Sequence, residues 1–527
     1  MNWSHWRRIR QAVQALTFAL YVYLLFAALQ RRAAFPLADL FFRLDPLTAL
    51  GAAIASRAWV PRLALALLTL GLTLVFGRVW CGWLCPLGTL LDWVTFRPAR
   101  RSSTGPGRSQ AAMLSERWRT VKYFLLLLIL AATLFGNLSL LVLDPLTLLT
   151  RTMTTVILPA LNHAVTAVER ALYPIPLLRP AIDWTERLLR GPVLPVEQPV
   201  FAQNAVLAAL FLGVLALNAL ADRFWCRYLC PLGALLGLLS KVSLLRPVVR
   251  PACNRCGHCV GVCPVDAIDT AQGYDIIPSE CTVCLDCLAA CPESSAQSPS
   301  TSNALSLPKS GIGFRLHWRP APPREYDPTR RQVLAALATS AAGVVVLRTG
   351  IRAKQPHPQL IRPPGVEDEG DFLARCLRCS QCMKVCPTSG LQPVLTEGGV
   401  EGLWTPQLVP RLGYCDYGCN ACGQVCPSGA IPSLALPRKR EATIGLAAID
   451  RDRCLPWAHG IPCIVCEEMC PTPEKAIRLE EVTMIDDRGE LAVVQRPYVL
   501  EDTCIGCGIC EYQCPVAGEA AIRVYRR

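Results

Sequence analysis

The chain has 527 residues, of which 52% are hydrophobic and 18% charged, with a formal net charge of +13 and 28 cysteines. This mix favours membrane segments joined to small cofactor-bound domains. The basic residues lie beside apolar segments and form no patch interleaved with aromatic residues, so we expect no nucleic acid as a partner. The cysteines form tight groups, which excludes a dispersed disulfide scaffold and is typical of metal-cluster ligands.

Four apolar runs lie in the first half of the chain, at residues 12–29, 63–80, 124–143 and 205–221. Each is close to the ~20 residues that a helix needs to cross a bilayer, so we predict an α-helical membrane domain of four spans over residues 1–250. Basic residues precede the first run and fill the loop 78–122. The positive-inside rule places this loop and residues 251–329 in the cytoplasm of a multi-pass protein, surrounded by lipid of the cytoplasmic (inner) membrane.

The membrane part contains an internal duplication. The sequence Arg-Val-Trp-Cys-Gly-Trp-Leu-Cys-Pro at 78–86 matches Arg-Phe-Trp-Cys-Arg-Tyr-Leu-Cys-Pro at 223–231. Two spans per unit make the repeat parallel, and its pseudo-twofold axis along the membrane normal brings the two motifs together at the cytoplasmic face. We predict that they hold one shared [4Fe–4S] cluster, with a redox disulfide or inert buried thiols as the alternatives. The four residues are Cys81, Cys85, Cys226 and Cys230.

Each repeat unit also carries Leu-Asp-Pro-Leu-Thr, at 44–48 and at 143–147. Asp45 and Asp144 are candidates for proton exchange with a quinol. The plainer interpretation of each is a helix N-cap before proline. The second unit has a longer outer loop at 150–200, whose Pro and Leu/Arg periodicity predicts short amphipathic helices lying on the membrane surface.

Residues 251–292 carry the run Cys-x₂-Cys-x₂-Cys-x₃-Cys-Pro twice. This is the two-cluster bacterial ferredoxin pattern, in which the fourth cysteine of each motif ligates the other cluster. Zinc sites normally use two Cys-x₂-Cys knuckles without this run, so we predict a cytoplasmic α+β module with two [4Fe–4S] clusters. One cluster takes Cys253, Cys256, Cys259 and Cys291, and the other takes Cys281, Cys284, Cys287 and Cys263.

A Ser/Pro-rich stretch at 293–329 predicts a flexible linker, and a fifth, shorter apolar helix follows at 330–350. It begins with Thr-Arg-Arg-Gln-Val-Leu at 329–334, which resembles a twin-arginine export signal placed inside the chain. The alternative is a pair of ordinary positive-inside arginines. Either interpretation places the rest of the chain, residues 351–527, in the periplasm.

Residues 351–527 carry four further motifs, each closed by Cys-Pro, and predict a periplasmic ferredoxin-like α+β domain with four [4Fe–4S] clusters. The first and fourth motifs are regular, whereas the second opens with three residues between its first two cysteines and the third opens with eight. In chain order the motifs are Cys376, Cys379, Cys382 and Cys386; Cys415, Cys419, Cys422 and Cys426; Cys454, Cys463, Cys466 and Cys470; and Cys504, Cys507, Cys510 and Cys514.

The predicted clusters account for every cysteine in the chain. Six ferredoxin motifs and the paired membrane motifs give seven clusters, which use all 28 cysteines as ligands. The chain has no Cys-x-x-Cys-His motif for a c-type haem and no glycine-rich dinucleotide motif in the right context. We therefore expect no site for chemistry on an ordinary substrate, and a chain that moves electrons as a subunit of an oxidoreductase.

Two known families share these motifs. Residues 1–291 resemble NapH, the membrane quinol dehydrogenase protein of periplasmic nitrate reduction, in the spans, the two Cys-x₃-Cys-Pro motifs and the two-cluster ferredoxin. Residues 329–527 resemble NapG, its periplasmic four-cluster partner, also in Arg-Pro-Pro-Gly at 362–365 before Phe-Leu-Ala-Arg-Cys at 372–376. The resemblance implies a fusion that relays electrons from the quinone pool to a periplasmic reductase or cytochrome.

The NapG resemblance also implies how the tail motifs share clusters, the first with the fourth and the second with the third. Cys514 then completes the first motif and Cys386 the fourth, while Cys470 completes the second and Cys426 the third. Two other functions stay open. One is a metal or thiol reductase or a transmembrane electron conduit for metalloenzyme maturation, and the other is a redox-sensing scaffold.

Overall fold

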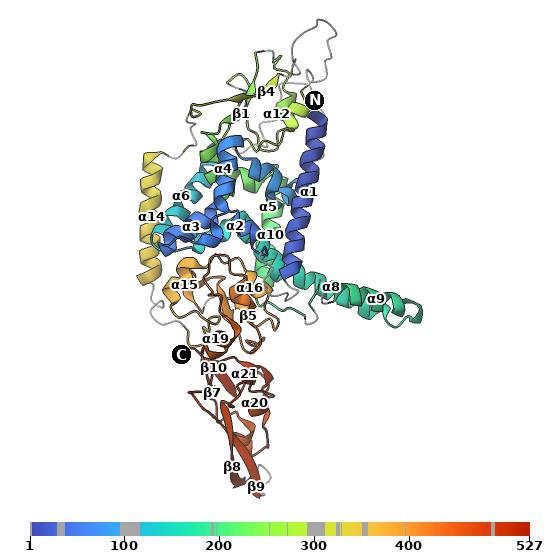
Figure 1. Ribbon diagram of the computed structural model, residues 1–527, viewed down its shortest axis with the longest axis vertical. Coiled ribbons are helices and arrows are strands. Elements are labelled where there is room, and N and C mark those ends of the chain that lie inside the picture. Colours follow the sequence, from blue (N-terminus) through green and yellow to red (C-terminus); the bar gives the residue numbers. More distant parts are fainter. Residues whose placement is uncertain are drawn as a thin grey trace.

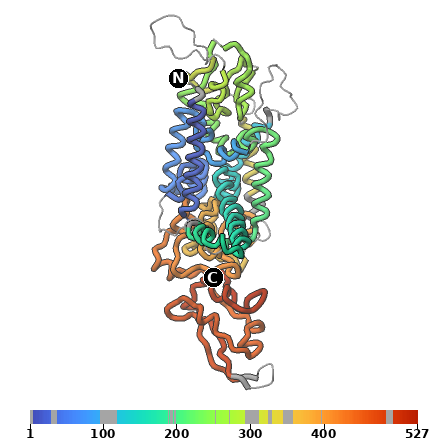
Figure 2. The backbone as a smooth tube through the Cα atoms, turned by 90° about the vertical axis from the view of Figure 1, so that its right-hand side faces the viewer, coloured from blue at the N-terminus to red at the C-terminus, as the bar shows by residue number. Residues whose placement is uncertain are grey.

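The computed structural model has three parts stacked along its long axis (Figure 1). A small module that includes residues 245–316 lies at one end, a layer of helices lies in the middle, and the cysteine-rich tail lies at the other end. Figure 2 shows the same order from the side. The structure describes residues 3–28, 37–94, 116–190, 194–195, 198–251, 253–270, 272–291, 311–322, 327, 329–349, 357–395, 397–485 and 491–527.

The helical layer begins with α1 (Trp3–Ala27), which runs along most of its height (Figure 1). Within the described residues, His5–Ala27 is the one helical stretch long and apolar enough to cross a membrane. The other apolar helices are shorter, so the predicted four-span architecture stays a prediction. The remaining helices of the layer are α2 (Leu40–Arg43), α3 (Pro46–Ser56), α4 (Ala66–Phe76), α5 (Pro86–Trp93), α6 (Thr120–Leu134), α7 (Pro145–Thr152), α8 (Leu158–Leu172), α9 (Arg179–Leu189), α10 (Asn204–Ala216), α11 (Pro231–Ser240) and α14 (Arg330–Thr349).

Glycines with a left-handed backbone shorten two of the predicted spans. Gly77 caps the end of α4 at a φ of 76°, and Gly136, also at 76°, follows the end of α6. Only glycine adopts this conformation without steric cost, so both helices stop there. Beyond Gly136 the predicted run continues as the 3₁₀ helix η6 (Ser139–Leu143).

The two repeat units have the same local structure. Asp45 and Asp144 cap α3 and α7, and each helix opens with proline. Each Cys-x₃-Cys motif forms one π-helical turn, η3 (Trp80–Leu84) or η10 (Trp225–Leu229). The second cysteine of each motif is then the residue before α5 or α11. The duplication therefore extends to the backbone conformation.

The predicted amphipathic segment of the second unit forms α8 and α9, which project sideways from the layer (Figure 1). Large apolar side chains on this arm are exposed, including Val168, Leu177 and Trp184. Such a surface suits the boundary between lipid headgroups and acyl chains. Its place at a membrane surface stays a prediction.

The small module lies beside the N-terminus of the chain (Figure 1), so we call it the N-terminal module. It pairs β1 (Leu245–Val249) with β4 (Ile312–Leu316), and β2 (Ile268–Asp269) with β3 (Asp275–Ile276), all antiparallel. Two short helices, α12 (His258–Val262) and α13 (Asp286–Ala289), follow cysteines of the two motifs. The strand β4 corrects the prediction of a linker over 293–329, because residues 312–316 are paired with β1. Residues 293–310, 323–326 and 328 of that linker lie outside the described residues.

The tail is built from short elements around its cysteines. It has three antiparallel pairs: β5 (Leu391–Pro393) with β6 (Pro406–Leu408), β7 (Leu446–Ile449) with β10 (Ile522–Tyr525), and the hairpin of β8 (Ile477–Ile485) and β9 (Leu491–Val499). Its helices are α15 (Glu369–Arg375), α16 (Gln381–Lys384), α17 (Gly399–Gly402), α18 (Ala421–Gln424), α19 (Leu436–Glu441), α20 (Val465–Glu468) and α21 (Ile509–Gln513). The hairpin forms the end of the molecule farthest from the helical layer (Figure 1).

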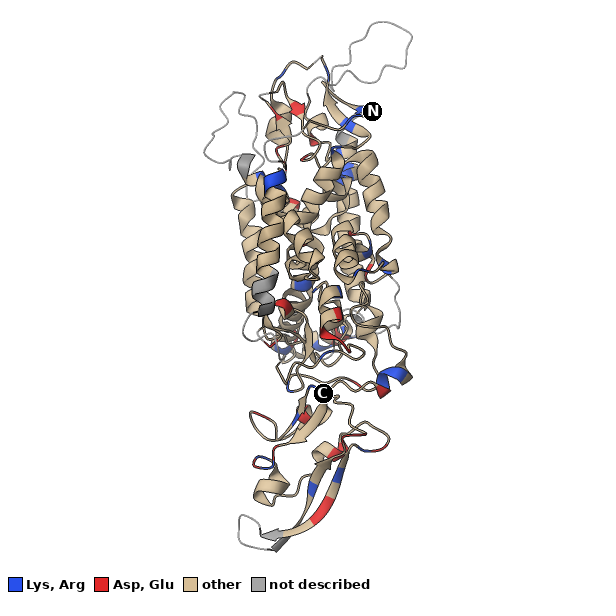
Figure 3. Cartoon of the chain, turned by 90° about the vertical axis from the view of Figure 1, so that its left-hand side faces the viewer, with Lys and Arg blue, Asp and Glu red and all other residues tan. Residues whose placement is uncertain are grey.

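The helix α14 joins the two ends. It begins at Arg330, as the motif analysis expected of a helix over 330–350, and it packs along α6, where Ser340 donates to the carbonyl of Leu128 at 3.2 Å. Figure 3 shows that the helical layer is mostly free of charged residues and that Lys, Arg, Asp and Glu gather toward its two ends. That distribution suits a layer whose middle contacts lipid.

Candidate iron–sulfur sites

The inner module group lines one cavity in the N-terminal module and comprises Cys263, Cys281, Cys284 and Cys287. The fourth cysteine of the first motif thus lies with three of the second, as predicted. Burial, with a smaller contribution from the charge of Cys263, raises the pKa of Cys281 to about 12. Thiols this reluctant to ionise become thiolates when a metal cation supplies the opposing charge.

The outer module group comprises Cys253, Cys256, Cys259 and Cys291. The first three are near one another, because the charges of Cys253 and Cys256 act on Cys259. Gly311 marks the fourth: a Cβ there would lie 3.4 Å from the Cβ of Cys253 and 3.6 Å from the Sγ of Cys291. The exchange of fourth cysteines predicted for this module is therefore present on both sides.

In the tail, neighbouring motifs pair, and the pairing implied by the NapG resemblance is wrong. Cys426 lies with Cys376, Cys379 and Cys382, and its charge acts on each of these thiols. We call these four the first tail group. Cys386 lies close enough to Cys415, Cys419 and Cys422 for its charge to raise the pKa of each thiol. These four cysteines are the second tail group.

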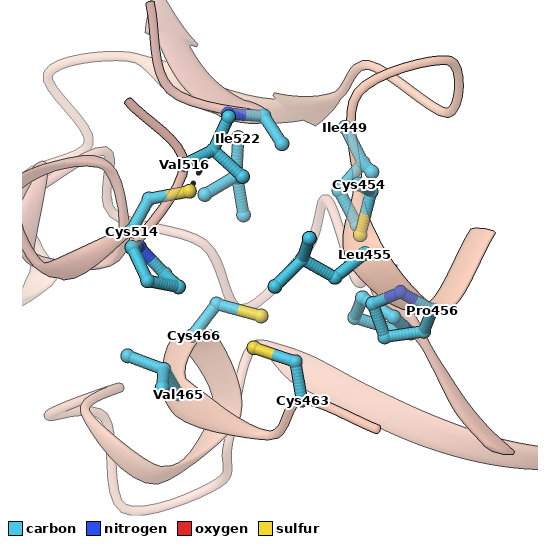
Figure 4. Close-up of a pocket in the computed structure, with 13 residues that line it drawn as sticks. Ile449, Cys454, Leu455, Pro456, Cys463, Val465, Cys466, Cys514, Val516 and Ile522 are labelled. Carbon is cyan, nitrogen blue, oxygen red and sulfur yellow. Dashed lines mark hydrogen bonds between the residues drawn. The ribbon is translucent and has the colours of Figure 1, made fainter. Parts of the chain in front are cut away.

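The third and fourth motifs exchange cysteines in the same way. Cys470 lines one cavity with Cys504, Cys507 and Cys510, which we call the third tail group. Cys514 lines another cavity with Cys454, Cys463 and Cys466, the fourth tail group. Figure 4 shows the sulfur atoms of this last group directed toward a common centre. In both pairs the motifs that exchange their fourth cysteines are consecutive in the chain.

The four tail groups form a line that starts at the helical layer. Leu377 and Cys379 of the first motif belong to the apolar core of that layer. The second and third tail groups touch, since the backbone N–H of Cys415 donates to the carbonyl of Cys507 at 2.8 Å. The fourth tail group is next to the third, because Cys466 lies close enough to Cys510 for its charge to raise the pKa of that thiol. The order in space is thus first, second, third and fourth tail group.

The two Cys-x₃-Cys-Pro motifs of the repeat meet in what we call the four-cysteine site. Cys81, Cys85, Cys226 and Cys230 are all buried, none is in a disulfide, and they lie close enough for their charges to interact. Cys230 also accepts a hydrogen bond from the backbone N–H of Gly233 at 3.2 Å. Four converging thiols suit an iron–sulfur cluster, which prefers four thiolates. The geometry therefore favours the cluster over inert, separated thiols.

The four-cysteine site lies directly against the N-terminal module. A Cβ at Gly82 would overlap the carbonyl oxygen of Thr282, which lies within the inner module group's loop. The indole of Trp83 donates to the carbonyl of Val283 at 2.9 Å. Gly82 thus lets the π-turn η3 touch the loop, and the two cysteine sites are neighbours.

Two buried arginines stand between these two sites, at equivalent positions of the repeat. Arg78 is near Cys81, Cys230 and Cys281, while Arg223 is near Cys226 and Cys284. Their positive charges offset thiolates on both sides. Their signal in the sequence is the duplication, since both stand three residues before the first cysteine of the motif.

The carboxylates of Asp45 and Asp144 are helix caps, as the plainer interpretation held. Asp45 accepts from the N–H of Leu47 at 2.8 Å, and Asp144 accepts from the N–H groups of Leu146 and Thr147 at 3.0 Å each. Both are fully buried, and their side chains are neighbours across the two repeat units. One oxygen of each carboxylate, Oδ2 of Asp45 and Oδ1 of Asp144, has no hydrogen-bond partner in the described part of the chain.

The number of cysteines per group suits an iron–sulfur cluster. Each group supplies four thiols, which is the donor set that a [4Fe–4S] cluster takes. Across the described part of the chain, no three His, Cys, Asp or Glu side chains are grouped as ligands of one metal ion.

Comparisons with known proteins agree with these groups. A family described as "4Fe-4S binding domain" matches residues 59–103 and 203–250, the two segments that contain the Cys-x₃-Cys-Pro motifs. The methylamine utilization ferredoxin-type protein MauM of Methylorubrum extorquens is 38% identical over 210 residues, which cover 38% of this chain and 90% of MauM. No solved structure matches.

Two further relatives carry the ferredoxin-type description. NapG of Haemophilus influenzae is 34% identical over 206 residues, covering 38% of this chain and 72% of NapG. NapF of Escherichia coli is 32% identical over 166 residues, covering 31% of this chain and 84% of NapF. Iron–sulfur electron transfer is thus the activity that the cysteine geometry and the relatives share, and the chain belongs to the family of ferredoxin-type proteins that includes MauM and NapG.

Proposed function

We propose that the chain is a membrane-bound iron–sulfur protein of the quinol-dehydrogenase type, which takes electrons from quinol and passes them along its tail to a periplasmic partner. The observation that carries this proposal is the line of four tail groups, from the core of the helical layer to the far end of the molecule. Bound [4Fe–4S] clusters supply one-electron acceptors and donors. The groups themselves hold these acceptors in an order that leads away from the layer.

The membrane topology belongs to the same proposal. The helical layer is a four-span domain, the N-terminal module is cytoplasmic, and the tail is periplasmic after export guided by Arg330 and Arg331. Support comes from the position of module and tail at opposite ends of a mostly uncharged layer (Figures 1 and 3). Protease added to sealed, right-side-out spheroplasts should remove the tail and spare the module. Cleavage of the module there would contradict this topology.

The cofactor content is seven [4Fe–4S] clusters, with all 28 cysteines as ligands. Iron and acid-labile sulfide in the purified full-length chain should each approach about 28 per molecule. A value near 24 would leave the four-cysteine site without a cluster. Cys85→Ala decides this case, because it should lower the iron content only if Cys85 is a ligand.

The partner that receives the electrons is a periplasmic reductase or cytochrome. MauM is named for methylamine utilization, so relatives of this chain act in more than one pathway. The fourth tail group offers the exit, because it is farthest from the layer and lies beside exposed apolar residues, Ile461, Ile464 and Met469. No nucleic acid is part of this function.

The test uses the full-length protein in detergent or vesicles with a short-chain quinol and a soluble cytochrome as acceptor. The wild type should reduce its clusters and then the cytochrome. Cys463→Ala, in the fourth tail group, should keep reduction of the other clusters and lose transfer to the cytochrome. Cys256→Ala, in the outer module group, is the matched control and should keep both. A protein that no quinol can reduce, even with its partners present, would rule the proposal out.

A second function is favoured by one contact. The inner module group lies against the four-cysteine site at the module end of the layer. A transmembrane electron conduit would use this contact to carry cytoplasmic electrons to the tail, for example for metalloenzyme maturation. Reduction of the tail by a cytoplasmic-side donor in quinone-depleted vesicles would select the conduit over quinol oxidation.

A further inference from the structure

Three cationic side chains are buried around the first tail group. Arg151, Arg378 and Lys384 are 1%, 2% and 5% exposed. Their charges act on cysteines of that group, those of Arg151 and Lys384 on Cys379. Arg378 acts on Cys376. All three cations therefore face one cysteine group.

None of these cations forms an ion pair with a carboxylate in the described part of the chain, although the charge of Glu401 reaches Arg378. The Nε and Nη1 atoms of Arg151 and the Nζ atom of Lys384 have no hydrogen-bond partner within the described part of the chain. Arg378 donates only to neutral groups, including the carbonyls of Cys376 at 2.9 Å and of Glu401 at 2.6 Å. Asp39 is the carboxylate whose charge reaches Lys384, and it is already paired with Arg43 at 2.7 Å.

The helical layer and the tail both contribute to this cation set. Arg151 belongs to α7 of the layer, and its guanidinium stacks on the ring of Trp404 in the tail at 4.2 Å. It stands just before the π-turn η7 (Met153–Ile157), which contacts α16, the helix of Lys384. Single π-turns within helices often occur at functional sites. The cation set thus exists only where the tail meets the layer.

Buried charge of one sign needs charge of the other sign nearby. Four thiolates around a [4Fe–4S] core carry net negative charge, and each added electron increases it. Cations held in a low-dielectric surrounding stabilise the more negative, reduced state and so raise the reduction potential. The three side chains have the placement that this effect requires.

We propose that Arg151 and Lys384 are potential-setting residues, which raise the reduction potential of the cluster bound by the first tail group and make it the point where the tail accepts electrons from the helical layer. This inference rests on the proposed function, in that the first tail group binds a cluster. It needs no particular donor, because the potential is a property of the cluster and its surroundings. Since Arg151 comes from the layer, the potential also depends on the tail's contact with α7.

The experiment is a redox titration of the full-length protein followed by electron paramagnetic resonance. The signal of the first tail group is the one that Cys379→Ala removes. In Arg151→Met and in Lys384→Met this signal should appear at a lower potential, while the other signals and the iron content stay unchanged. Arg151→Lys keeps the charge and should restore most of the potential.

The matched control is Arg451→Met. Arg451 also stacks on a tail tryptophan, Trp457, at 4.3 Å, but it is exposed and lies by the fourth tail group. Its loss should leave the first tail group's potential unchanged. Unchanged potentials in both Arg151→Met and Lys384→Met, at full iron content, would overturn the inference. The titration uses no quinol, so a failure of quinol oxidation would leave its result standing.

Discussion

The two ends of the helical layer hold their cysteine groups with cations used in different ways. At the module end the buried cations are paired with carboxylates. Lys122 and Arg78 share Glu280, at 2.5 Å and 3.8 Å, and Arg223 pairs with Asp92. These pairs join residues of the layer to one another and to the module, so charge at this end serves to hold two parts together.

At the tail end the corresponding cations keep their charge unpaired. Arg151 and Lys384 form no ion pair with a carboxylate in the described part of the chain and instead face Cys379. A carboxylate partner weakens the field that a cation exerts on its other neighbours, whereas an unpaired buried cation acts in full on the charges near it. The comparison shows that ion pairs at the module end hold the module against the layer, whereas unpaired cations at the tail end set the electrostatic surroundings of a cluster site.

The largest expected effect concerns which cysteines share a cluster at the tail end. Cys426→Ala should remove the same paramagnetic signal as Cys379→Ala and about four iron atoms, because both belong to the first tail group. Cys514→Ala should instead remove the signal that Cys463→Ala removes. If Cys514→Ala and Cys379→Ala removed the same signal, the pairing of neighbouring motifs would be wrong, and with it the order of the tail.

The next effect tests whether the ion pairs at the module end hold the module against the layer. Glu280→Leu leaves Lys122 and Arg78 buried without their carboxylate, which should destabilise the contact between module and layer by about 3–5 kcal/mol. Limited proteolysis of the full-length protein should then release the module much faster than in the wild type. Glu441→Leu removes an exposed partner of Arg438 and is the control, since such surface pairs contribute about 0–1 kcal/mol. Equal proteolysis rates in the two variants would show that these ion pairs do not hold the module against the layer.

The sequence predicted the module better than the tail, for a physical reason. Within residues 251–292 two motifs can exchange fourth cysteines in only one way, so spacing alone was enough. With four motifs several exchanges satisfy the same spacing, and the resemblance selected the wrong one. The same difference separates the buried cations that the sequence could reveal from those that it could not. Arg78 and Arg223 occupy equivalent positions of the duplication. Arg151 has Ala52 at its equivalent position, and it lies near Cys379, which is distant in the sequence.

A smaller effect is expected from the close approach at the module end. Gly82→Ala would place a methyl group against the carbonyl of Thr282, and the backbone there has little room to move. Overpacking of this kind typically costs about 1–3 kcal/mol. Gly71→Ala is the control, because a Cβ at Gly71 meets no atom within 4 Å. Denaturant unfolding of the module should shift in Gly82→Ala alone, and a shift of equal size in both variants would mean that the approach is not tight.

The smallest effect concerns Asp45 and Asp144, two neighbouring buried carboxyl groups that belong to the cysteine groups of neither end. Asp45→Asn keeps the N-cap of α3, so stability should change little, whereas Asp45→Ala loses the cap and should cost about 1 kcal/mol. If the pair only caps helices, Asp45→Asn should also reduce its clusters from quinol at the wild-type rate. A rate that falls in Asp45→Asn and in Asp144→Asn alike, at unchanged unfolding midpoints, would assign these carboxyl groups to proton exchange in quinol oxidation. The rate and the midpoint together separate a cap from a proton carrier, because only the carrier loses function when its shape is kept and its exchangeable proton is removed.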